Sequence, residues 1–363
     1  MKIFLVCNSL GGGGAERVHV NLANGFAQRG HEVYLIADVN QPASYPVDEQ
    51  VHVLPLCPQS TNKLKKWGGA VSMLRKNIKR YKPDVVIGNM ALCSILSRLA
   101  SLYLRTPVIF SNHHALQSEE YHIDRLTKIC DSFLPRIMTA TTLLTVADKE
   151  YMNKKYHYQK NVFVMPNPLT FIPIEVMSTC QNYILAAGRL NNWIYKGWDI
   201  LIEATRVLAP ILRNKGWKVQ IVGGGADNQR AVIDAMIHNN CVEDIVELLG
   251  FRTDMERLFQ RASIFCLSSR SEGLPMVLIE AMSQGCAPVA CENLGRTKEI
   301  ITSQEEGLLF KTADVNDLAE KLKMMIDNED YRCSVQKKAV ERSKYYSVDN
   351  IINMWEEMLK SIT

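Results

Sequence analysis

The segment ASIFCLSSRSEGLPMVLIEAMSQG, residues 262–285, decides the fold of this 363-residue chain. Residues 262–268 form an apolar run with the length and composition of a buried β-strand. After a polar loop, Pro275 suits a first helical turn, because its φ is fixed and its missing N–H is not needed there. Apolar residues then recur with the spacing of one helix face, at Val277, Leu278, Ala281 and Met282. The segment therefore predicts a strand, a loop and a helix that ends near Gly285.

Two acidic residues, Glu272 in the loop and Glu280 in the helix, suggest the chemistry of this segment. Free backbone N–H groups in the first turn, around Met276 and Val277, favour an anion such as a phosphate. A carboxylate one turn further in can accept hydrogen bonds from a sugar diol, and a loop carboxylate can face the other side of the same ligand. The alternative is an ordinary connection with a solvated Glu272 and a surface Glu280.

The whole segment from residue 269 to 285, and not only its two acids, resembles the retaining glycosyltransferases of family 4. The resemblance implies the α/β GT-B fold, in which two Rossmann-like parallel-sheet domains face each other across a cleft and a C-terminal helix crosses back to the first domain. It implies that Glu280 binds ribose and that Glu272 faces the donor sugar or its phosphate. It also implies further donor contacts at Gly273, Leu274, Pro275, Met276 and Val277.

The length of the chain favours two domains. With this family in mind, we expect an acceptor-side domain at residues 1–166 and a linker at 167–182. A nucleotide-sugar-binding domain would follow at 183–345, and a crossover helix at 346–363.

The glycine-rich loop at residues 11–14 lies between an expected strand at 3–7 and an expected helix from Ala15. A dinucleotide fingerprint fails here, because Glu16 and Arg17 stand where its third glycine belongs. The stretch GGGGAERV resembles the opening of family 4 enzymes, where this loop reaches toward the donor phosphate and acceptor; the residues concerned are Gly13, Gly14 and Glu16. A mobile surface loop is the alternative. Asp38, after the expected strand at 31–37, is interpreted as a solvent-facing strand end.

Further strands of the first half are expected at residues 84–88, 107–110, 143–147 and 162–165, with a helix at 91–104. Two histidines follow the strand at 107–110, where ligands enter open α/β sheets. His113 matches the family's histidine beside the donor sugar, with His114 as the alternative register, and its imidazole can donate a hydrogen bond to a sugar hydroxyl. Asn167 resembles a family asparagine, although an asparagine that only makes a turn competes with that interpretation.

In the second half, Arg189 and Lys196 follow an expected strand at 183–187. Two cations at such a place suit a diphosphate, and GRL followed by KG resembles the family's pyrophosphate-binding pair; two surface cations are the alternative. Glycines 223–225 indicate close packing beside the nucleotide, or an ordinary turn. The resemblance implies base contacts after the strand at 246–250, at Gly250, Phe251 and Arg252.

Residues 1–170 carry 20 Lys and Arg against 12 Asp and Glu. Eight of these cations lie in the segment Lys63–Lys82, which is either a contact with an anionic membrane or a solvated helix face. Nucleic acid is a less favoured partner, because the total charge of the chain is low.

Ten scattered cysteines, without CxxC or Cys/His metal spacing, favour reduced thiols in the cytoplasm. The apolar N-terminus is too short for a signal peptide, and no apolar run reaches membrane-span length.

The resemblance implies a hexosyltransferase that retains anomeric configuration. The absence of an Asp-x-Asp motif agrees with a reaction that needs neither metal nor cofactor. The expected donor is a nucleoside-diphosphate sugar, preferably of uridine, and the acceptor is a hydroxyl of a polysaccharide or lipid-linked glycan, as in lipopolysaccharide or capsule synthesis. Such an enzyme would work in the cytoplasm, at the inner face of the membrane. The alternatives are a non-transferring GT-B protein, such as a sugar-nucleotide epimerase, and a non-catalytic nucleotide-sugar-binding module.

Overall fold

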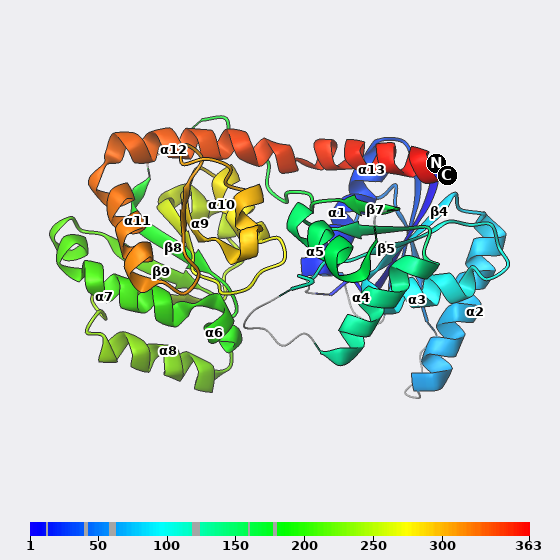
Figure 1. The fold of residues 1–363 in the computed structure, drawn as a ribbon, viewed down its shortest axis with the longest axis horizontal. Helices are drawn as coiled ribbons and strands as arrows, with labels where there is room; N and C mark the ends of the chain where they lie inside the picture. Colours follow the sequence, from blue (N-terminus) through cyan, green and yellow to red (C-terminus); the bar gives the residue numbers. More distant parts are fainter. Residues whose placement is uncertain (12–13, 40–42, 58–62, 118–123, 159, 177–179) are drawn as a thin grey trace. The chain divides into compact units, whose positions relative to one another are not determined.

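The structure is a computed structural model that describes residues 1–11, 14–39, 43–57, 63–117, 124–158, 160–176 and 180–363 (Figure 1). The described residues form two compact units. Unit 1 comprises those within 1–117, 124–168 and 348–363, and unit 2 those within 169–347.

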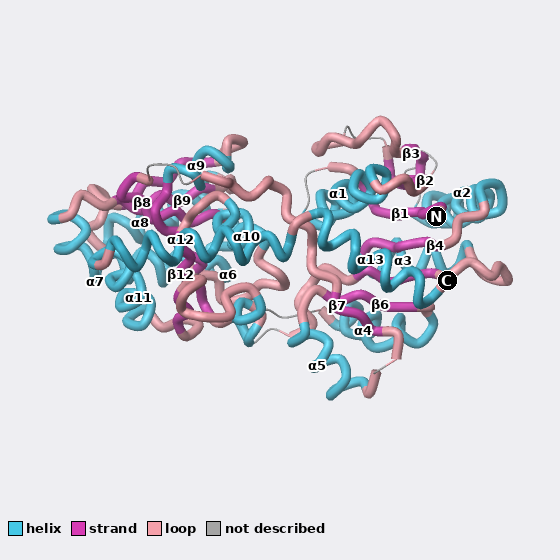
Figure 2. The backbone as a smooth tube through the Cα atoms, turned by 90° about the horizontal axis from the view of Figure 1, so that it is seen from above, coloured by secondary structure: helices cyan, strands magenta, loops and turns pink. Residues whose placement is uncertain are grey.

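Unit 1 is built on a parallel seven-stranded sheet. In sheet order its strands are β3 (His52–Pro55), β2 (Glu32–Asp38), β1 (Lys2–Ser9), β4 (Val85–Asn89), β5 (Val108–Ser111), β6 (Ala140–Leu143) and β7 (Val162–Val164). Its helices are α1 (Gly14–Gln28), α2 (Lys63–Tyr81), α3 (Met90–Ala100), α4 (Arg125–Ile137), α5 (Val146–Tyr156) and α13 (Val348–Ile362). Figure 2 shows these strands in magenta with helices around them. The central strands are mostly apolar and buried, because helices cover both faces of the sheet.

Alternate residues of β1 enter two separate cores. Leu5 joins the core formed with α1 and α13, whereas Phe4 joins the core formed with α2 and α3. The last helix, α13, places Ile352 and Trp355 in the first of these cores. Gly25 on α1 makes this contact close, since a Cβ added there would lie 2.8 Å from Ile352 Cγ1. The C-terminal helix thus returns to unit 1 after the chain has built unit 2, as the resemblance implied.

Unit 2 is built on a parallel six-stranded sheet. In sheet order its strands are β10 (Val246–Gly250), β9 (Lys218–Val222), β8 (Gln181–Ala187), β11 (Ala262–Leu267), β12 (Ala287–Cys291) and β13 (Leu308–Phe310). Its helices are α6 (Trp193–Lys196), α7 (Trp198–Asn214), α8 (Asp227–Asn239), α9 (Met255–Arg261), α10 (Met276–Ser283), α11 (Val315–Asp327) and α12 (Glu329–Ser343). Ile264 packs in the core with Trp198, whereas its neighbour Phe265 contacts Phe259 of α9, with ring centroids 5.7 Å apart.

The expected strand at 143–147 is wrong. The strand, β6, ends at Leu143, and α5 begins at Val146. The helix starts here because the Thr145 side chain caps it and accepts a hydrogen bond from the Asp148 N–H at 3.1 Å. Asp38 does end β2, as expected, but its side chain is only 17% exposed and its carboxylate lies 2.8 Å from Lys66 Nζ.

The basic segment forms α2, whose apolar residues Leu74 and Ile78 are buried in the core of unit 1. Trp67 also packs against that core. Within the described ranges, no helix combines the length and apolar character needed to cross a membrane.

Candidate active site

In each sheet the strand order reverses at one point, and ligands of open α/β sheets bind beside the strand ends at such a point. In unit 2 the reversal falls between β8 and β11. The loop after β8 carries Arg189 and Lys196, and the loop after β11 leads through Glu272 to α10. The predicted cations and acids of unit 2 therefore leave neighbouring strands at one edge of the sheet.

Lys196 and Glu272 form an ion pair, with Nζ 2.6 Å from Oε1 and both side chains mostly buried. The connection from β8 coils into a 3₁₀ turn at Leu190–Asn192 and then α6, which returns Lys196 to the sheet edge. Gly188 makes room for the lysine stem, because a Cβ there would lie 2.9 Å from Lys196 Cδ. The long spacing between Arg189 and Lys196 is thus taken up by two short helices.

Several contacts fix α6 to the loop after β11. Arg270 donates to both carboxylate oxygens of Asp199 at 2.7 Å and to the carbonyl of Ile194 at 2.6 Å. Gly197, with φ +66°, lies so close to Ser268 that an added Cβ would be 2.1 Å from its carbonyl oxygen. The lysine and the acid-bearing loop therefore form one rigid element.

Arg189 is exposed, and within the described residues its guanidinium has no hydrogen-bond or ion-pair partner. Pro275 occupies the N-cap position of α10, where no side chain accepts from the first-turn N–H groups, among them those of Met276 and Val277. An available cation and an uncapped helix start are both suited to an anionic group. Gly273 and Leu274 lie in the loop that precedes this helix start.

Glu280 is only 6% exposed. Its helix is buried on nearly all sides, since Ile279 is as inaccessible as the predicted face residues Leu278 and Ala281. The alternative of a surface Glu280 is therefore wrong, and the carboxylate belongs to the interior side of α10.

The glycines after β9 permit very close packing of strand ends. A Cβ on Gly223 would lie 1.8 Å from the Gly188 carbonyl oxygen, and one on Gly225 would lie 2.6 Å from Leu190 Cβ.

The predicted base contacts follow the neighbouring strand β10, which ends at Gly250 with φ +70°. Of the predicted base contacts beyond it, Phe251 is 77% exposed. Arg252 is paired with Asp254, Nε to Oδ1 at 2.8 Å and Nη2 to Oδ2 at 2.7 Å.

Asn293, in the loop after β12, is a site residue that sequence reasoning did not single out. Its buried amide accepts from the Glu272 N–H at 3.2 Å and donates to the Glu272 carbonyl at 3.0 Å. Its φ of +42° is a conformation that asparagine tolerates better than most residues. The local sequence marks it only as an asparagine in a loop that follows an apolar run.

At the carboxyl edge of the unit 1 sheet, His113 lies between Ser111 and Asn167. Its Nε2 is 3.0 Å from Ser111 Oγ, and its Nδ1 is 3.0 Å from Asn167 Oδ1. Since the amide oxygen can only accept, Nδ1 carries the proton and Nε2 accepts from the serine hydroxyl. Burial lowers the pKa of His113 to about 4, so the ring is neutral at pH 7.

The fully buried His19 of α1 packs edge-to-face on His113, with ring centroids 5.2 Å apart. Burial, and next the neighbouring His113, lower the pKa of His19 to about 3. Its Nδ1 lies 3.2 Å from the Ala15 carbonyl, and its Nε2 has no partner within the described residues. His19 was not predicted, and nothing in its local sequence distinguishes it from a core residue.

His114 points to a different set of groups. Its Nε2 lies 2.9 Å from the buried carboxylate of Asp131 on α4, which also accepts from the Asn112 amide at 3.1 Å. His113 and His114, adjacent in sequence, thus belong to separate hydrogen-bond networks.

Of the predicted glycine-loop residues, Gly13 lies outside the described residues, Gly14 begins α1, and Glu16 lies in the first turn of α1.

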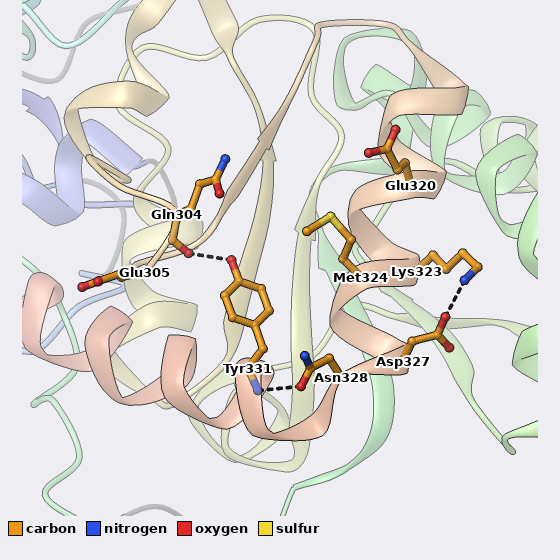
Figure 3. Close-up of a pocket in the computed structure, with 8 residues that line it drawn as sticks. All are labelled: Gln304, Glu305, Glu320, Lys323, Met324, Asp327, Asn328 and Tyr331. Atoms are coloured by element: carbon orange, nitrogen blue, oxygen red, sulfur yellow. Dashed lines mark hydrogen bonds and ion pairs between the residues drawn. The ribbon is translucent and has the colours of Figure 1, made fainter.

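A surface hollow of about 710 Å³ in unit 2 contains none of the predicted site residues. It lies between α11, α12 and the loop before β13, where Tyr331 donates to the Gln304 carbonyl at 2.7 Å (Figure 3). Its charged lining residues are Glu305, Glu320, Lys323 and Asp327, with an ion pair between the last two.

Comparison with known proteins agrees with this geometry. The family model described as Glycosyltransferase Family 4 matches residues 12–170, and the model described as Glycosyl transferases group 1 matches residues 171–342. Two parallel-sheet units of this kind, with these matches, define a glycosyltransferase of the GT-B class. The chain belongs to glycosyltransferase family 4.

Similar proteins cover nearly the whole chain. An uncharacterized glycosyltransferase of Haemophilus influenzae is 26% identical over 98% of this chain and 99% of its own. The Campylobacter jejuni GalNAc-alpha-(1->4)-GalNAc-alpha-(1->3)-diNAcBac-PP-undecaprenol alpha-1,4-N-acetyl-D-galactosaminyltransferase is also 26% identical, over 100% of this chain and 99% of its own. Anabaena Alr3699/HepE, solved with UDP and glucose, shares the fold with a TM-score of 0.81 at 19% identity, over 99% of this chain and 100% of its own.

Proposed function

We propose that this glycosyltransferase moves a sugar, with retention of anomeric configuration, from a nucleoside diphosphate to a hydroxyl of a lipid-linked glycan. The observation that carries the proposal is the Lys196–Glu272 ion pair, with Nζ 2.6 Å from Oε1. Its two residues, and Arg189 with its partner-free guanidinium, follow the ends of neighbouring strands. The two cations bind the diphosphate, and the uncapped start of α10 contributes its N–H groups.

The leaving diphosphate develops negative charge as the bond to the sugar breaks, and positive groups placed there lower the barrier. Lys196 and Arg189 are those groups. The diphosphate leaves from the face that the acceptor attacks, and its departing oxygen takes the proton of the acceptor hydroxyl as the new bond to the sugar forms. No carboxylate has to bond covalently to the sugar. In this mechanism Glu272 orients Lys196 and faces the sugar, while Glu280 accepts from the ribose hydroxyls. The same charges replace a metal ion, and we propose that transfer is metal-independent.

The donor and acceptor are proposed from relatives. HepE binds UDP, which supports a uridine donor. Two Campylobacter jejuni relatives that match nearly the whole chain act on undecaprenol-diphosphate glycans, which supports a lipid-linked acceptor. An amylovoran biosynthesis glycosyltransferase, 25% identical over 96% of this chain, keeps polysaccharide as a related acceptor class. The enzyme would then meet its acceptor at the cytoplasmic face of an anionic membrane.

In unit 1, the neutral His113 is proposed to contact a sugar hydroxyl, with Asn167 holding its ring in the Nδ1–H form. Since both ring nitrogens are engaged, this contact requires Nε2 to exchange its bond with Ser111 for one with the ligand. Gly14 and Glu16, at the start of α1, are proposed to approach the same ligand.

The test incubates the full chain with radiolabelled nucleotide sugars, with and without a membrane lipid extract, and in the presence of a chelator. We expect label in the lipid fraction only when extract is present, undiminished by the chelator, and an unchanged anomeric configuration by NMR of the product. Arg189→Ala and Glu280→Gln should each lower incorporation about a hundredfold or more. Conversion of the sugar nucleotide without acceptor would identify an epimerase, and wild-type activity in both variants would refute the assigned roles.

A further inference from the structure

Asn89 of unit 1 is a buried residue whose side-chain oxygen is unpaired. It is 4% exposed, and its Oδ1 has no partner within the described residues. It occupies the N-cap position of α3, where an asparagine usually accepts from a first-turn N–H, yet its side chain makes no such bond. A buried polar atom without a partner destabilises the fold, so a ligand that supplies the missing donor would bind favourably there.

The place of Asn89 in the sheet is one where ligands bind. Asn89 ends β4, and the strand order of unit 1 reverses between β1 and β4. The next residue, Met90, has a φ of +57°, which residues other than glycine rarely adopt and which is typical of functional sites. Met90 also accepts through its Sδ from the His113 N–H at 3.3 Å. Asn89 therefore lies at the same edge as His113.

The hydroxyl groups next to Asn89 use their protons elsewhere. Asn89 is in register with Ser111 of β5, and Ser111 with Thr142 of β6, so the three side chains project to one face. The Thr142 hydroxyl donates to Ser111 Oγ at 3.2 Å, and the Ser111 hydroxyl donates to His113 Nε2 at 3.0 Å. Neither hydroxyl therefore has a proton left for the Asn89 oxygen.

A second unpaired acceptor faces the same side of the sheet. His19 belongs to α1, which covers the face on which Ile87, two residues before Asn89, is buried. The His19 ring packs on His113 at the carboxyl edge. Its Nδ1 lies 3.2 Å from the Ala15 carbonyl and carries the proton, so Nε2 keeps a lone pair that has no partner within the described residues. Two buried acceptors at one edge favour a ligand with O–H groups.

We propose that Asn89 and His19 determine sugar specificity, by accepting hydrogen bonds from two hydroxyls of one neutral ring, the terminal sugar of the acceptor glycan. Two unpaired acceptors repel a phosphate, whereas a sugar ring supplies donors without charge. A sugar that lacks either hydroxyl leaves a buried acceptor unpaired and is rejected. Met90 and His113 beside this subsite are partly exposed, so it lies just beneath the surface of unit 1.

This inference deepens the proposed function, on which it rests for the role of the sugar as acceptor. Sugar binding is measured without transfer, so the two proposals fail separately. Transfer to a lipid extract by an enzyme whose sugar binding ignores Asn89 would refute the subsite alone. Sugar binding that depends on Asn89, in a chain that transfers nothing, would refute the transferase activity alone.

The test measures binding of the methyl glycosides of glucose, galactose, N-acetylglucosamine and N-acetylgalactosamine to the full chain by saturation-transfer NMR, with and without UDP. We expect at least one glycoside to bind, and its Kd to rise about fivefold or more in Asn89→Ala and in His19→Phe, which keeps an aromatic ring beside His113. Ser101→Ala is the matched control. The Ser101 hydroxyl is also buried and unpaired, but it lies at the C-terminal end of α3, and the variant should bind as the wild type does.

Single-deoxy analogues of the bound glycoside show which hydroxyl meets Asn89. One analogue should bind the wild type about as weakly as the parent glycoside binds Asn89→Ala, with no further loss in the variant. The melting temperature of Asn89→Ala should stay within about 3 °C of the wild type, because its Oδ1 makes no bond in the folded chain. If every analogue binds the wild type as tightly as the parent does, water satisfies the two acceptors and the proposal is overturned.

UDP-glucose and UDP-N-acetylgalactosamine separate the donor sugar from the acceptor sugar. Asn89→Ala should leave the Kd of both nucleotide sugars unchanged, because the diphosphate is held in unit 2. A higher Kd for a nucleotide sugar, with unchanged glycoside binding, would assign the donor sugar to Asn89 and overturn the acceptor subsite. So would a wild type that binds no glycoside, or equal losses in Asn89→Ala and Ser101→Ala.

Discussion

Lys196 Nζ lies 2.6 Å from Glu272 Oε1, although the two residues are 76 positions apart in the chain. The pair links the loop after β8 to the loop after β11, on either side of the reversal in strand order. The ion pair fixes the ammonium group of Lys196 where we propose that the donor diphosphate binds. Glu272 is one of the two acids that the family resemblance indicates.

The first prediction concerns this cation. Lys196→Met should lower kcat about 10²–10³-fold, because charge on the leaving diphosphate loses a fixed donor. The free energy of unfolding should also fall, by about 1–3 kcal/mol, because the mostly buried Glu272 carboxylate loses its cation. Lys215→Met breaks an exposed pair of similar length in unit 2, Lys215 Nζ to Asp327 Oδ1 at 2.7 Å, and should leave kcat unchanged. Steady-state kinetics and urea unfolding are the measurements. An equal loss of kcat in the Lys196 and Lys215 variants would argue against a specific role of Lys196.

Asn293 is predicted to position Glu272. Asn293→Ala removes two hydrogen bonds to the Glu272 backbone and should reduce kcat/KM for the donor about 10- to 100-fold. Asn293→Gly also removes the bonds but adopts the observed φ of +42° without strain. Both variants should be impaired in donor kinetics; full recovery in the glycine variant would show that backbone conformation alone matters.

Gly223 is predicted to be required for packing. Gly223→Ala places a Cβ 1.8 Å from the Gly188 carbonyl oxygen and should cost about 1–3 kcal/mol or more of unfolding free energy. The neighbouring Gly224→Ala meets only ordinary contact, 3.5 Å from Phe251 Cβ, and should stay within about 0.5 kcal/mol of wild type. Urea unfolding of the two variants side by side is the measurement, and equal stabilities would contradict the close approach.

His19 predicts a pH dependence of stability. Burial lowers the pKa of His19 from 6.5 to about 3, so the unfolded chain takes up the proton first as the pH falls. Stability should therefore be unaffected by this residue above about pH 7.5 and should decrease below about pH 6.5, by about 2 kcal/mol at pH 5. His19→Leu should flatten this part of the stability curve in urea unfolding between these pH values. An identical slope in the variant would show that another group titrates.

Much of the architecture follows from local sequence. The apolar run at 262–268, the polar loop and the helix from Pro275 were all predictable, because strand and helix periods and a fixed proline φ act within a few residues. The apolar run at 143–147 was wrongly predicted to be a strand, because Thr145 caps the start of α5 within it. There a capping side chain, and not hydrophobicity, decides the element.

The sequence by itself determined two series of parallel strands, the family, and which residue types a diphosphate sugar would need. Only the tertiary structure decided the partners: Glu272 with Lys196 and Asn293, and His113 with His19 and Asn167. The physical reason is that these pairs are joined across the edges of sheets, where strand order and close glycine packing, and not spacing along the chain, set which side chains meet.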